Sequence, residues 1–232
     1  MSPTVSSITP APPRELPRGP HRLAREVVLA SQRGRMLDAM AEVVAEKGYA
    51  ATTVADAIGK AGVSRKTFYE HFRDKEDCFL AAYDAGVELL LETLRGASGD
   101  AGAGEPADLL DNARARTRAY LETLASEPAF ARTFLIEVAA AGPAALARRE
   151  AVHDRFAALL REQLEAARAQ LPELPLPPDE VYLAAVGATD LVVSRLVASG
   201  RVSELPQLED AVLHIQLSLL VGGAAAALAA RR

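Results

Sequence analysis

The sequence of 232 residues is long enough for one large or two modest domains, and 50% of its residues are hydrophobic while 25% are charged. This composition can bury a sizeable core, which excludes disorder and fibrous architectures for most of the chain. A single cysteine excludes a disulfide framework and a cysteine-based zinc site, and it favours a reducing, cytoplasmic compartment. The low aromatic content and the scarcity of β-branched runs argue against a sheet-rich fold.

The net charge of −5 is unevenly distributed along the chain. Residues 1–75 carry 12 basic and 8 acidic side chains, whereas residues 76–232 carry 14 basic and 23 acidic ones. A basic end joined to an acidic body indicates a head that binds a polyanion and a separate body for regulation or assembly.

Residues 1–24 are predicted to form a disordered tail, because prolines and small polar residues dominate this stretch and it lacks apolar periodicity. No continuous apolar stretch follows its arginines, so a secretory signal is not expected. From about Arg25, apolar residues recur at spacings of three, four and seven, which predicts a helix. Gly48, a residue free to adopt positive φ, is expected to end it.

The pattern stays helical in the rest of the chain, and no segment alternates with period two for long enough to require a strand. Gly-, Ser- or Pro-containing linkers separate the predicted helices, which cover residues 75–95, 106–125, 128–140, 144–170, 179–199 and 207–229. The fold class is therefore predicted to be all-α.

The block from Ala51 to Phe72 predicts two short helices joined by a tight turn. Thr52 or Thr53 can N-cap the first helix, and Asp56 lies at or near its third position, as in a capping box. Gly62 supplies the backbone freedom that the turn requires.

Ser64 can cap the second short helix, in which Phe68 and Phe72 lie four residues apart and are expected to face inward. The polar and basic residues are left on its outer faces: Arg65, Lys66, Thr67, Tyr69 and His71. Two short helices with a glycine turn form a helix-turn-helix, whose second helix fits the major groove of double-stranded DNA.

The chemistry of these side chains suits a DNA duplex. Arg65 and Lys66 can donate hydrogen bonds to guanine O6 and N7. Three hydroxyls and one flanking ammonium can reach phosphates, namely those of Tyr69, Thr52, Thr53 and Lys75. Because the positive charge of the head is modest, specific binding is expected to need two copies.

The run from about Gln32 to Ala85 resembles the DNA-binding domain of the tetracycline-repressor (TetR) family of bacterial regulators. The matching segments are Gly48-Tyr49, Thr52 to Asp56, Ala61 to Ser64, Thr67 to Phe72 and Asp74-Lys75-Glu76. The resemblance implies a three-helix helix-turn-helix domain over residues 25–74, followed by a helical effector-binding and dimerisation domain over residues 75–232. The implied DNA-contacting residues are Thr52, Thr53, Ser64, Arg65, Lys66, Thr67, Tyr69, His71 and Lys75.

The sequence departs from the family pattern within the first short helix. Many members have a bulky apolar residue followed by alanine where this chain has Ala57 and Ile58, so the packing between the two short helices is expected to be shifted. Gly59 weakens the same helix by about 1 kcal/mol relative to alanine.

The resemblance further implies a homodimer that forms through the last two helices, residues 179–199 and 207–229. The second of these stretches is apolar nearly all round, so something must bury it. Residues 211–230 are nominally long enough to span a bilayer, but their polar residues and many alanines give a poor drive for insertion. A dimer helix is therefore preferred, and no membrane partner is expected.

Members of the family hold a small-molecule effector among the middle helices, and here a partly apolar effector is expected. The candidate contacts are Tyr83, Leu90, Tyr120, Phe130, Phe134, Glu137, Phe156, Thr189 and Asp190. For each single aromatic residue among them, a place in the ordinary core is favoured over contact with a ligand. Asp190 could contact a ligand or a structural partner such as Arg195, or it could be a carboxylate at a helix edge or interface.

We expect no catalytic site, cofactor or metal. The sequence has no glycine-rich phosphate loop, no nucleophile elbow and no His-Glu-x-x-His motif. His153 beside Asp154 is too small a set for a metal site, and Cys78 is predicted to be an inert core residue. The favoured function is a ligand-responsive homodimeric repressor that binds a pseudo-palindromic operator. The alternative is an architectural or activator-type DNA-binding protein without a small-molecule effector.

Overall fold

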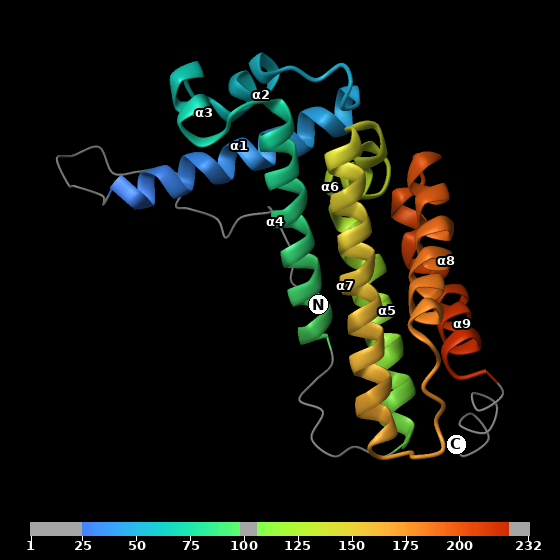
Figure 1. Cartoon of the computed structure of the whole chain (residues 1–232). Coiled ribbons are helices and arrows are strands. Elements are labelled where there is room, and N and C mark those ends of the chain that lie inside the picture. Colours follow the sequence, from blue (N-terminus) through green and yellow to red (C-terminus); the bar gives the residue numbers. More distant parts are fainter. Residues whose placement is uncertain (1–24, 98–105, 223–232) are drawn as a thin grey trace. The chain divides into compact units, whose positions relative to one another are not determined.

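The computed structural model describes residues 25–97 and 106–222 (Figure 1). This described part is helical and contains no strand, which confirms the predicted all-α class. The helices are α1 (Arg25–Lys47), α2 (Val54–Ala61), α3 (Arg65–His71), α4 (Lys75–Gly96), α5 (Pro106–Ser126), α6 (Pro128–Leu135), α7 (Pro143–Arg168), α8 (Asp179–Ala198) and α9 (Glu209–Leu220). Two 3-10 segments, η1 (Glu137–Ala140) and η2 (Val202–Leu208), complete the order. The predicted tail, residues 1–24, and the end of the last predicted helix, residues 223–229, lie outside the described residues.

The chain divides into two compact units. Unit 1 contains the described residues up to Leu89 together with Glu127–Ala145, and unit 2 contains Leu90–Ser126 together with the described residues from Leu146 onward. The sequence predicts a single boundary at residue 75. The unit boundary lies farther along α4, and α6 and η1 belong to unit 1 although unit 2 segments flank them in the chain.

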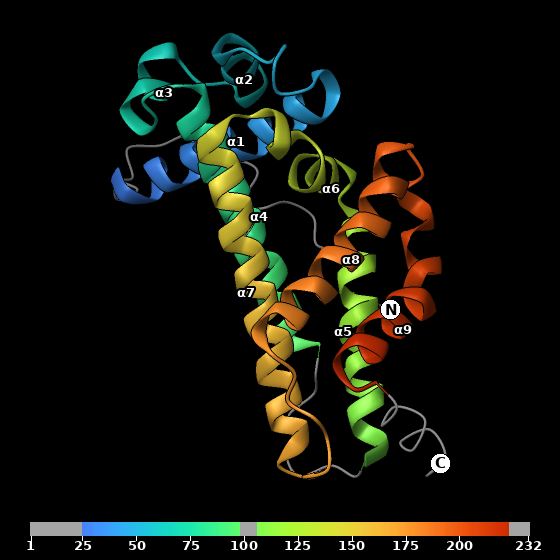
Figure 2. The same cartoon turned by 45° about the vertical axis from the view of Figure 1, so that its right-hand side comes forward.

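The core of unit 1 forms around an apolar stripe of α1. Met36, Met40 and Val44 are fully buried, as residues spaced by four on one face of a helix are when that face is covered. Helix α6 crosses this face, and the Thr133 hydroxyl donates a hydrogen bond to the Ala41 carbonyl oxygen at 3.3 Å. Helix α2 packs against α1, and α3 packs against α2, in the same unit (Figure 2).

The stretch predicted as one helix over residues 128–140 contains a break. Helix α6 ends at Leu135, and the chain continues as a 3-10 turn from Glu137. Ile136, at the break, has ψ of −59° and a φ of −112°, which lies well outside the usual helical range. A hydrogen bond from the Tyr49 amide to the Glu137 carboxylate holds the turn at this place.

Within unit 2, α8 and α9 lie side by side in both views (Figures 1 and 2). Buried Tyr182 and Ala185 on α8 share a cluster with Leu220 at the end of α9. Arg118 on α5 donates to Glu209 at the start of α9 at 2.8 Å, which fixes α9 against α5.

Helix α8 is also the one described helix that is long and apolar enough to cross a membrane by length and composition, a test that core helices of soluble proteins pass as well.

Candidate nucleic-acid interface

The first short helix, α2, begins with the predicted capping box. The Thr53 hydroxyl accepts a hydrogen bond from the Asp56 amide at 3.2 Å, and the Asp56 carboxylate accepts one from the Thr53 amide at 2.9 Å. Lys47 donates to the same carboxylate at 2.6 Å, and this hydrogen bond, with those from Thr53, lowers the pKa of Asp56 to about 2. Thr53 is therefore the cap, of the two candidates that the sequence offers.

Thr52 has an internal role. Its side chain is 2% exposed, and its hydroxyl donates to the Gly48 carbonyl oxygen at 2.9 Å. A buried hydroxyl with this partner is poorly placed to reach a phosphate on the surface. We therefore leave Thr52 out of the set of side chains proposed to contact DNA.

The turn and the start of α3 form as the sequence predicts. Gly62 has φ of 64° and ψ of 39°, the left-handed conformation that glycine adopts at no steric cost. The Ser64 hydroxyl accepts a hydrogen bond from the Thr67 amide at 3.0 Å and lies 2.8 Å from the Thr67 hydroxyl. Phe68 and Phe72 are buried, which confirms the inward face of α3.

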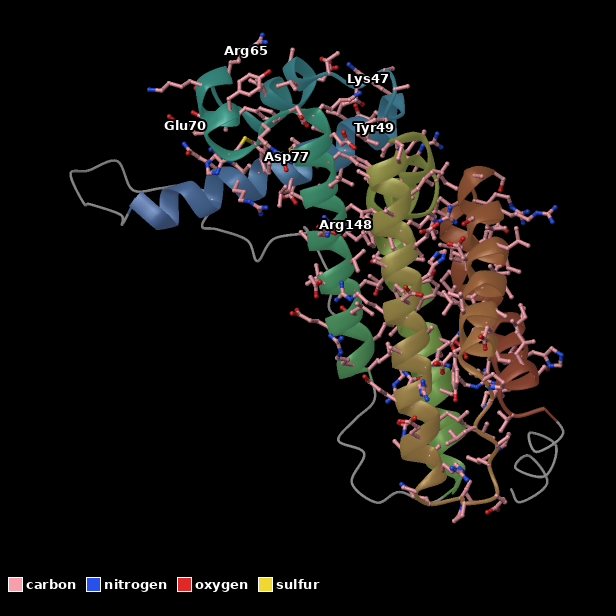
Figure 3. All side chains as sticks on the ribbon, viewed as in Figure 1. Lys47, Tyr49, Arg65, Glu70, Asp77 and Arg148 are labelled. Atoms are coloured by element: carbon pink, nitrogen blue, oxygen red, sulfur yellow. The ribbon has the colours of Figure 1, made fainter. Side chains whose placement is uncertain are left out.

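The opposite face of α3 presents basic and aromatic groups to solvent. The Lys66 side chain is 87% exposed, and its ammonium lies 3.9 Å from Glu70. The Arg65 guanidinium lies over the ring of Tyr69, 5.6 Å from the ring centroid, and Tyr69 is itself 46% exposed. Figure 3 shows Arg65 pointing away from the ribbon of α3. This face can offer several donors and one aromatic platform to an anionic polymer.

His71 and Thr67 are less exposed than the residues of that face. Both are half-buried, and the Nε2 atom of His71 is covered by protein without a hydrogen-bond partner among the described residues. The His71 ring lies 6.2 Å from that of Phe72. His71 therefore reaches the edge of the proposed DNA-binding face.

Lys75, at the start of α4, has a partner inside unit 1. Its ammonium donates to the Tyr49 carbonyl oxygen at 2.9 Å and lies 4.1 Å from the centroid of the Tyr49 ring. An ammonium has three donors, so a phosphate contact stays possible for the other two, and the predicted role of Lys75 stays a prediction.

The effector candidates are divided between the two units. In unit 1, Tyr83 on α4 stacks on Phe134 of α6 at 5.6 Å, and Phe134 stacks on Phe130 at 5.3 Å. Glu137 is 7% exposed, and its carboxylate accepts a hydrogen bond from the Tyr49 amide at 2.9 Å and forms an ion pair with Arg132 at 3.0 Å. Both oxygens of Glu137 thus have protein partners, which favours a structural role over contact with an effector.

In unit 2, the uncharged effector candidates contact other protein groups or are buried. Tyr120 on α5 and Phe156 on α7 meet edge to face at 6.2 Å, and Leu90 is buried. The Thr189 hydroxyl donates to the Ala185 carbonyl oxygen at 2.9 Å, within α8.

The charged candidate in unit 2, Asp190, forms an ion pair. Its carboxylate lies 2.5 Å from the Arg149 guanidinium of α7. Of the alternatives that the sequence leaves open, a structural partner is the one observed, and this partner is Arg149 on another helix instead of Arg195. The residue pattern of α8 alone could not predict this partner, because Arg149 lies on a different helix.

Sequence reasoning did not single out Arg116. Its Nε atom is covered by protein and has no hydrogen-bond partner in the part of the chain that the structure describes. Burial lowers the pKa of this guanidinium, and no neighbouring carboxylate compensates. Arg116 lies one helical turn before Tyr120, on the same side of α5. A half-buried cation without a counter-charge is a candidate ligand for an anion.

The described residues contain no cluster of three or more His, Cys, Asp or Glu side chains that could hold a metal ion. Cys78 is buried in unit 1, as the sequence predicts, and burial raises the pKa of its thiol to about 12. Such a thiol carries almost no thiolate at neutral pH.

Comparison with known proteins finds a family match over the same residues. Residues 36–82, from the middle of α1 into α4, match the family model described as bacterial regulatory proteins, tetR family. The matched span includes the capping box of α2, the turn at Gly62 and the whole of α3.

Two curated relatives match over about a third of this chain. The HTH-type transcriptional activator FasR of Mycolicibacterium smegmatis is 32% identical over 79 residues, which cover 34% of this chain and 36% of FasR. The uncharacterized HTH-type transcriptional regulator YerO of Bacillus subtilis is 28% identical over 76 residues, which cover 33% of this chain and 26% of YerO. The matches thus span about a third or less of each relative.

Solved structures are similar to this chain over most of its length. The fatty acid degradation regulator FadR of Bacillus halodurans has a TM-score of 0.70 at 21% identity, covering 83% of this chain and 95% of FadR. The transcriptional regulator FadR of Bacillus subtilis, solved in complex with stearoyl-CoA, has a TM-score of 0.68 at 18% identity, covering 81% of this chain and 97% of that one. At these identities the likeness shows the fold.

Proposed function

We propose that this chain is a tetR-family transcriptional regulator that binds double-stranded DNA through α3. The observation that carries the proposal is the division of α3 into two faces. Phe68 and Phe72 anchor one face in the core of unit 1, while the other presents Arg65, Lys66 and Tyr69 to solvent. A short helix held from behind in this way can enter the major groove with its N-terminal side chains toward the base edges. DNA as the partner implies a cytoplasmic location.

The proposed assembly is a homodimer formed through α8 and α9. Leu183 and Leu191 on α8 and Leu219 on α9 are large apolar side chains that are exposed in the single chain, Leu191 by 61%. A second copy that covers them would bring two α3 helices to a pseudo-palindromic operator, with half-sites about one helical turn apart.

The favoured mode of regulation is repression that a small molecule releases. An effector that binds the DNA-free form better by about 1–3 kcal/mol weakens operator binding by about 5–150-fold. Activation is the second candidate, because FasR, which is similar to this chain over 79 residues, is described as a transcriptional activator.

We propose an effector with an apolar body and an anionic group. The half-buried guanidinium of Arg116, whose Nε atom has no hydrogen-bond partner among the described residues, supports the anionic group. The aromatic pair of Tyr120 and Phe156 supports the apolar body. The structural likeness to FadR of Bacillus subtilis, whose complex contains stearoyl-CoA, makes long-chain acyl-CoA thioesters the first class to screen.

The test is footprinting of the purified protein on the DNA upstream of its own gene, followed by binding measurements with variants. Arg65→Ala and Lys66→Ala are expected to weaken operator binding by about 1–3 kcal/mol each and to relax the preference for operator over random duplex. Lys75→Ala is expected to weaken binding to both duplexes, because it removes a proposed phosphate contact and also the hydrogen bond to the Tyr49 carbonyl oxygen. If Lys66→Ala combined with Tyr69→Ala leaves operator affinity unchanged, α3 does not contact the DNA.

A further inference from the structure

We propose that the peptide groups on either side of Tyr49 form a junction through which two other segments of the chain set the position of α2 and α3. The effect of the junction on DNA binding rests on the proposed function, whereas the contacts that form the junction belong to unit 1. Tyr49 lies in the turn between α1 and α2, and it is labelled in Figure 3. Its amide and its carbonyl oxygen are each held by a charged side chain from a different segment.

Glu137 holds the amide side of the junction. Its Oε2 atom accepts the Tyr49 amide at 2.9 Å across a sequence separation of 88 residues. Its Oε1 atom lies 3.0 Å from the Arg132 guanidinium. Gly48 packs beside this carboxylate, since an added Cβ atom would lie 3.4 Å from Oε2 in ordinary van der Waals contact, and its φ of +80° favours glycine. The carboxylate is therefore fixed in place by an ion pair and fits against the turn.

Lys75 holds the carbonyl side of the junction. Its ammonium donates to the Tyr49 carbonyl oxygen at 2.9 Å and lies over the Tyr49 ring. The Tyr49 ring also makes an edge-to-face contact with Phe79, one turn farther along α4, with the ring centroids 4.8 Å apart. The Tyr49 side chain and its carbonyl group are thus both attached to the first two turns of α4.

The junction leads directly into the helix-turn-helix. The Thr52 amide lies 3.2 Å from both the Gly48 and the Tyr49 carbonyl oxygens, and the Thr52 hydroxyl donates to the first of these. Thr53 then caps α2. A displacement of Tyr49 is therefore transmitted to the start of α2, because consecutive hydrogen bonds connect the turn with the N-cap of that helix.

The two segments that hold Tyr49 are the same two that connect unit 1 with unit 2. Lys75 begins α4, which continues past Leu89 into unit 2. Glu137 belongs to the stretch 127–145, which joins unit 2 at both of its ends. These covalent connections can carry a rearrangement of unit 2 into unit 1, and both lead to the peptide groups of Tyr49. Because coupling is reciprocal, DNA bound by α3 must in turn bias the stretch 127–145.

The experiment compares Glu137→Ala with Glu137→Gln in the full-length chain. Glutamine keeps an oxygen that accepts the Tyr49 amide although it gives up the ion pair with Arg132, whereas alanine leaves that part-buried amide without an acceptor. Hydrogen exchange of the Tyr49 region is expected to become at least about tenfold faster in Glu137→Ala and to stay within about threefold of the wild-type rate in Glu137→Gln. Glu162→Ala, which removes an exposed carboxylate on α7, is the matched control and should leave this rate unchanged.

The coupling is measured with the operator fragment that the footprint defines. Operator binding is expected to slow hydrogen exchange in residues 128–140 of the wild type and of Glu137→Gln, and this effect should be lost in Glu137→Ala, together with about tenfold of the operator affinity. Equal exchange rates and equal affinities in all three proteins would overturn the inference. If Glu137→Ala does not fold, Glu137→Asp, which keeps the charge but withdraws the oxygen by one methylene, should shift both readouts in the same direction.

The failure of the junction is distinguishable from the failure of the proposed function. If no duplex is footprinted, DNA binding is wrong, while the exchange rate of the Tyr49 amide still decides whether Glu137 holds the turn. If operator binding is found but exchange in residues 128–140 does not respond to it, the coupling is wrong and DNA binding stands.

Discussion

Asp38 on α1 is a half-buried carboxyl group whose Oδ1 atom has no hydrogen-bond partner in the described chain. Burial, together with the nearby charge of Glu42, raises the pKa of Asp38 to about 6. An unfolded aspartate titrates near 3.9, so only the folded state is penalised for ionising this group. The penalty is absent below about pH 4 and grows as the pH rises through 6, so this group reduces stability at neutral pH.

We therefore expect Asp38→Asn to raise the thermal unfolding midpoint at pH 7 and to have a smaller effect at pH 5. Thermal unfolding followed by circular dichroism at a series of pH values measures both. His153 works in the opposite direction, because burial lowers its pKa, but it is common to both proteins and cancels in their difference. A difference in midpoint that does not change with pH would contradict the assignment to Asp38.

Residue-level prediction succeeded where the partners are close in sequence. The Thr53 capping box and the Ser64 cap each span three residues, and the inward positions of Phe68 and Phe72 follow from helical spacing. The Tyr49 contacts could not be predicted in this way, because Lys75 and Glu137 lie 26 and 88 residues away. Their side chains look like ordinary surface charges until the fold brings them to the turn.

At the level of the helices, three glycines permit a matched test of local packing. Gly59 lies inside α2 with nothing near an added Cβ atom, so Gly59→Ala is expected to stabilise unit 1 by about 1 kcal/mol. Gly62 has φ of +64°, so Gly62→Ala should destabilise it by about 1 kcal/mol or more. At Gly86 on α4, an added Cβ atom would lie 2.3 Å from the Phe130 ring, so Gly86→Ala should cost about 1–3 kcal/mol.

Denaturant unfolding of these three variants measures the order of their stabilities. The expected order is Gly59→Ala above the wild type, with Gly62→Ala and Gly86→Ala both below it. A stabilised Gly86→Ala would show that α4 and α6 do not approach as closely as the structure places them.

The extents of most helices follow from apolar periodicity and from proline and glycine positions, because these signals are local. The structure agrees with the predicted stretches to within a few residues for α4, α5, α7 and α8. The break at Ile136 is not predictable from periodicity, since apolar residues continue across it and a contact with the distant Tyr49 holds the turn that follows. The assignment of α6 to unit 1 depends on packing against α1 and α4, which periodicity does not specify.

For the whole molecule, the exposed leucines of α8 and α9 give a prediction about assembly. Leu191→Glu places a charge at the most exposed large apolar position of α8 and is expected to convert a dimer into a monomer, because a buried unpaired charge opposes association. Light scattering coupled to size-exclusion chromatography measures the mass. Leu176→Glu, at an exposed position outside both helices, is the control and should leave the mass unchanged.

The monomeric variant should also lose most of its operator affinity, because a single α3 reaches only one half-site. An unchanged mass for Leu191→Glu, or a monomeric wild type with full operator affinity, would contradict the assembly through α8 and α9.

Because residues 127–145 belong to unit 1, a chimera of two related proteins requires carefully chosen crossover points. A chimera with a single crossover at the start of α4 would graft a foreign α6 onto the α1 of this protein. Three crossovers, near residues 89, 126 and 145, would transplant each unit with its own contacts intact. Recombination within this family should therefore favour exchanges that respect the interleaved connectivity over simple swaps of the N-terminal third.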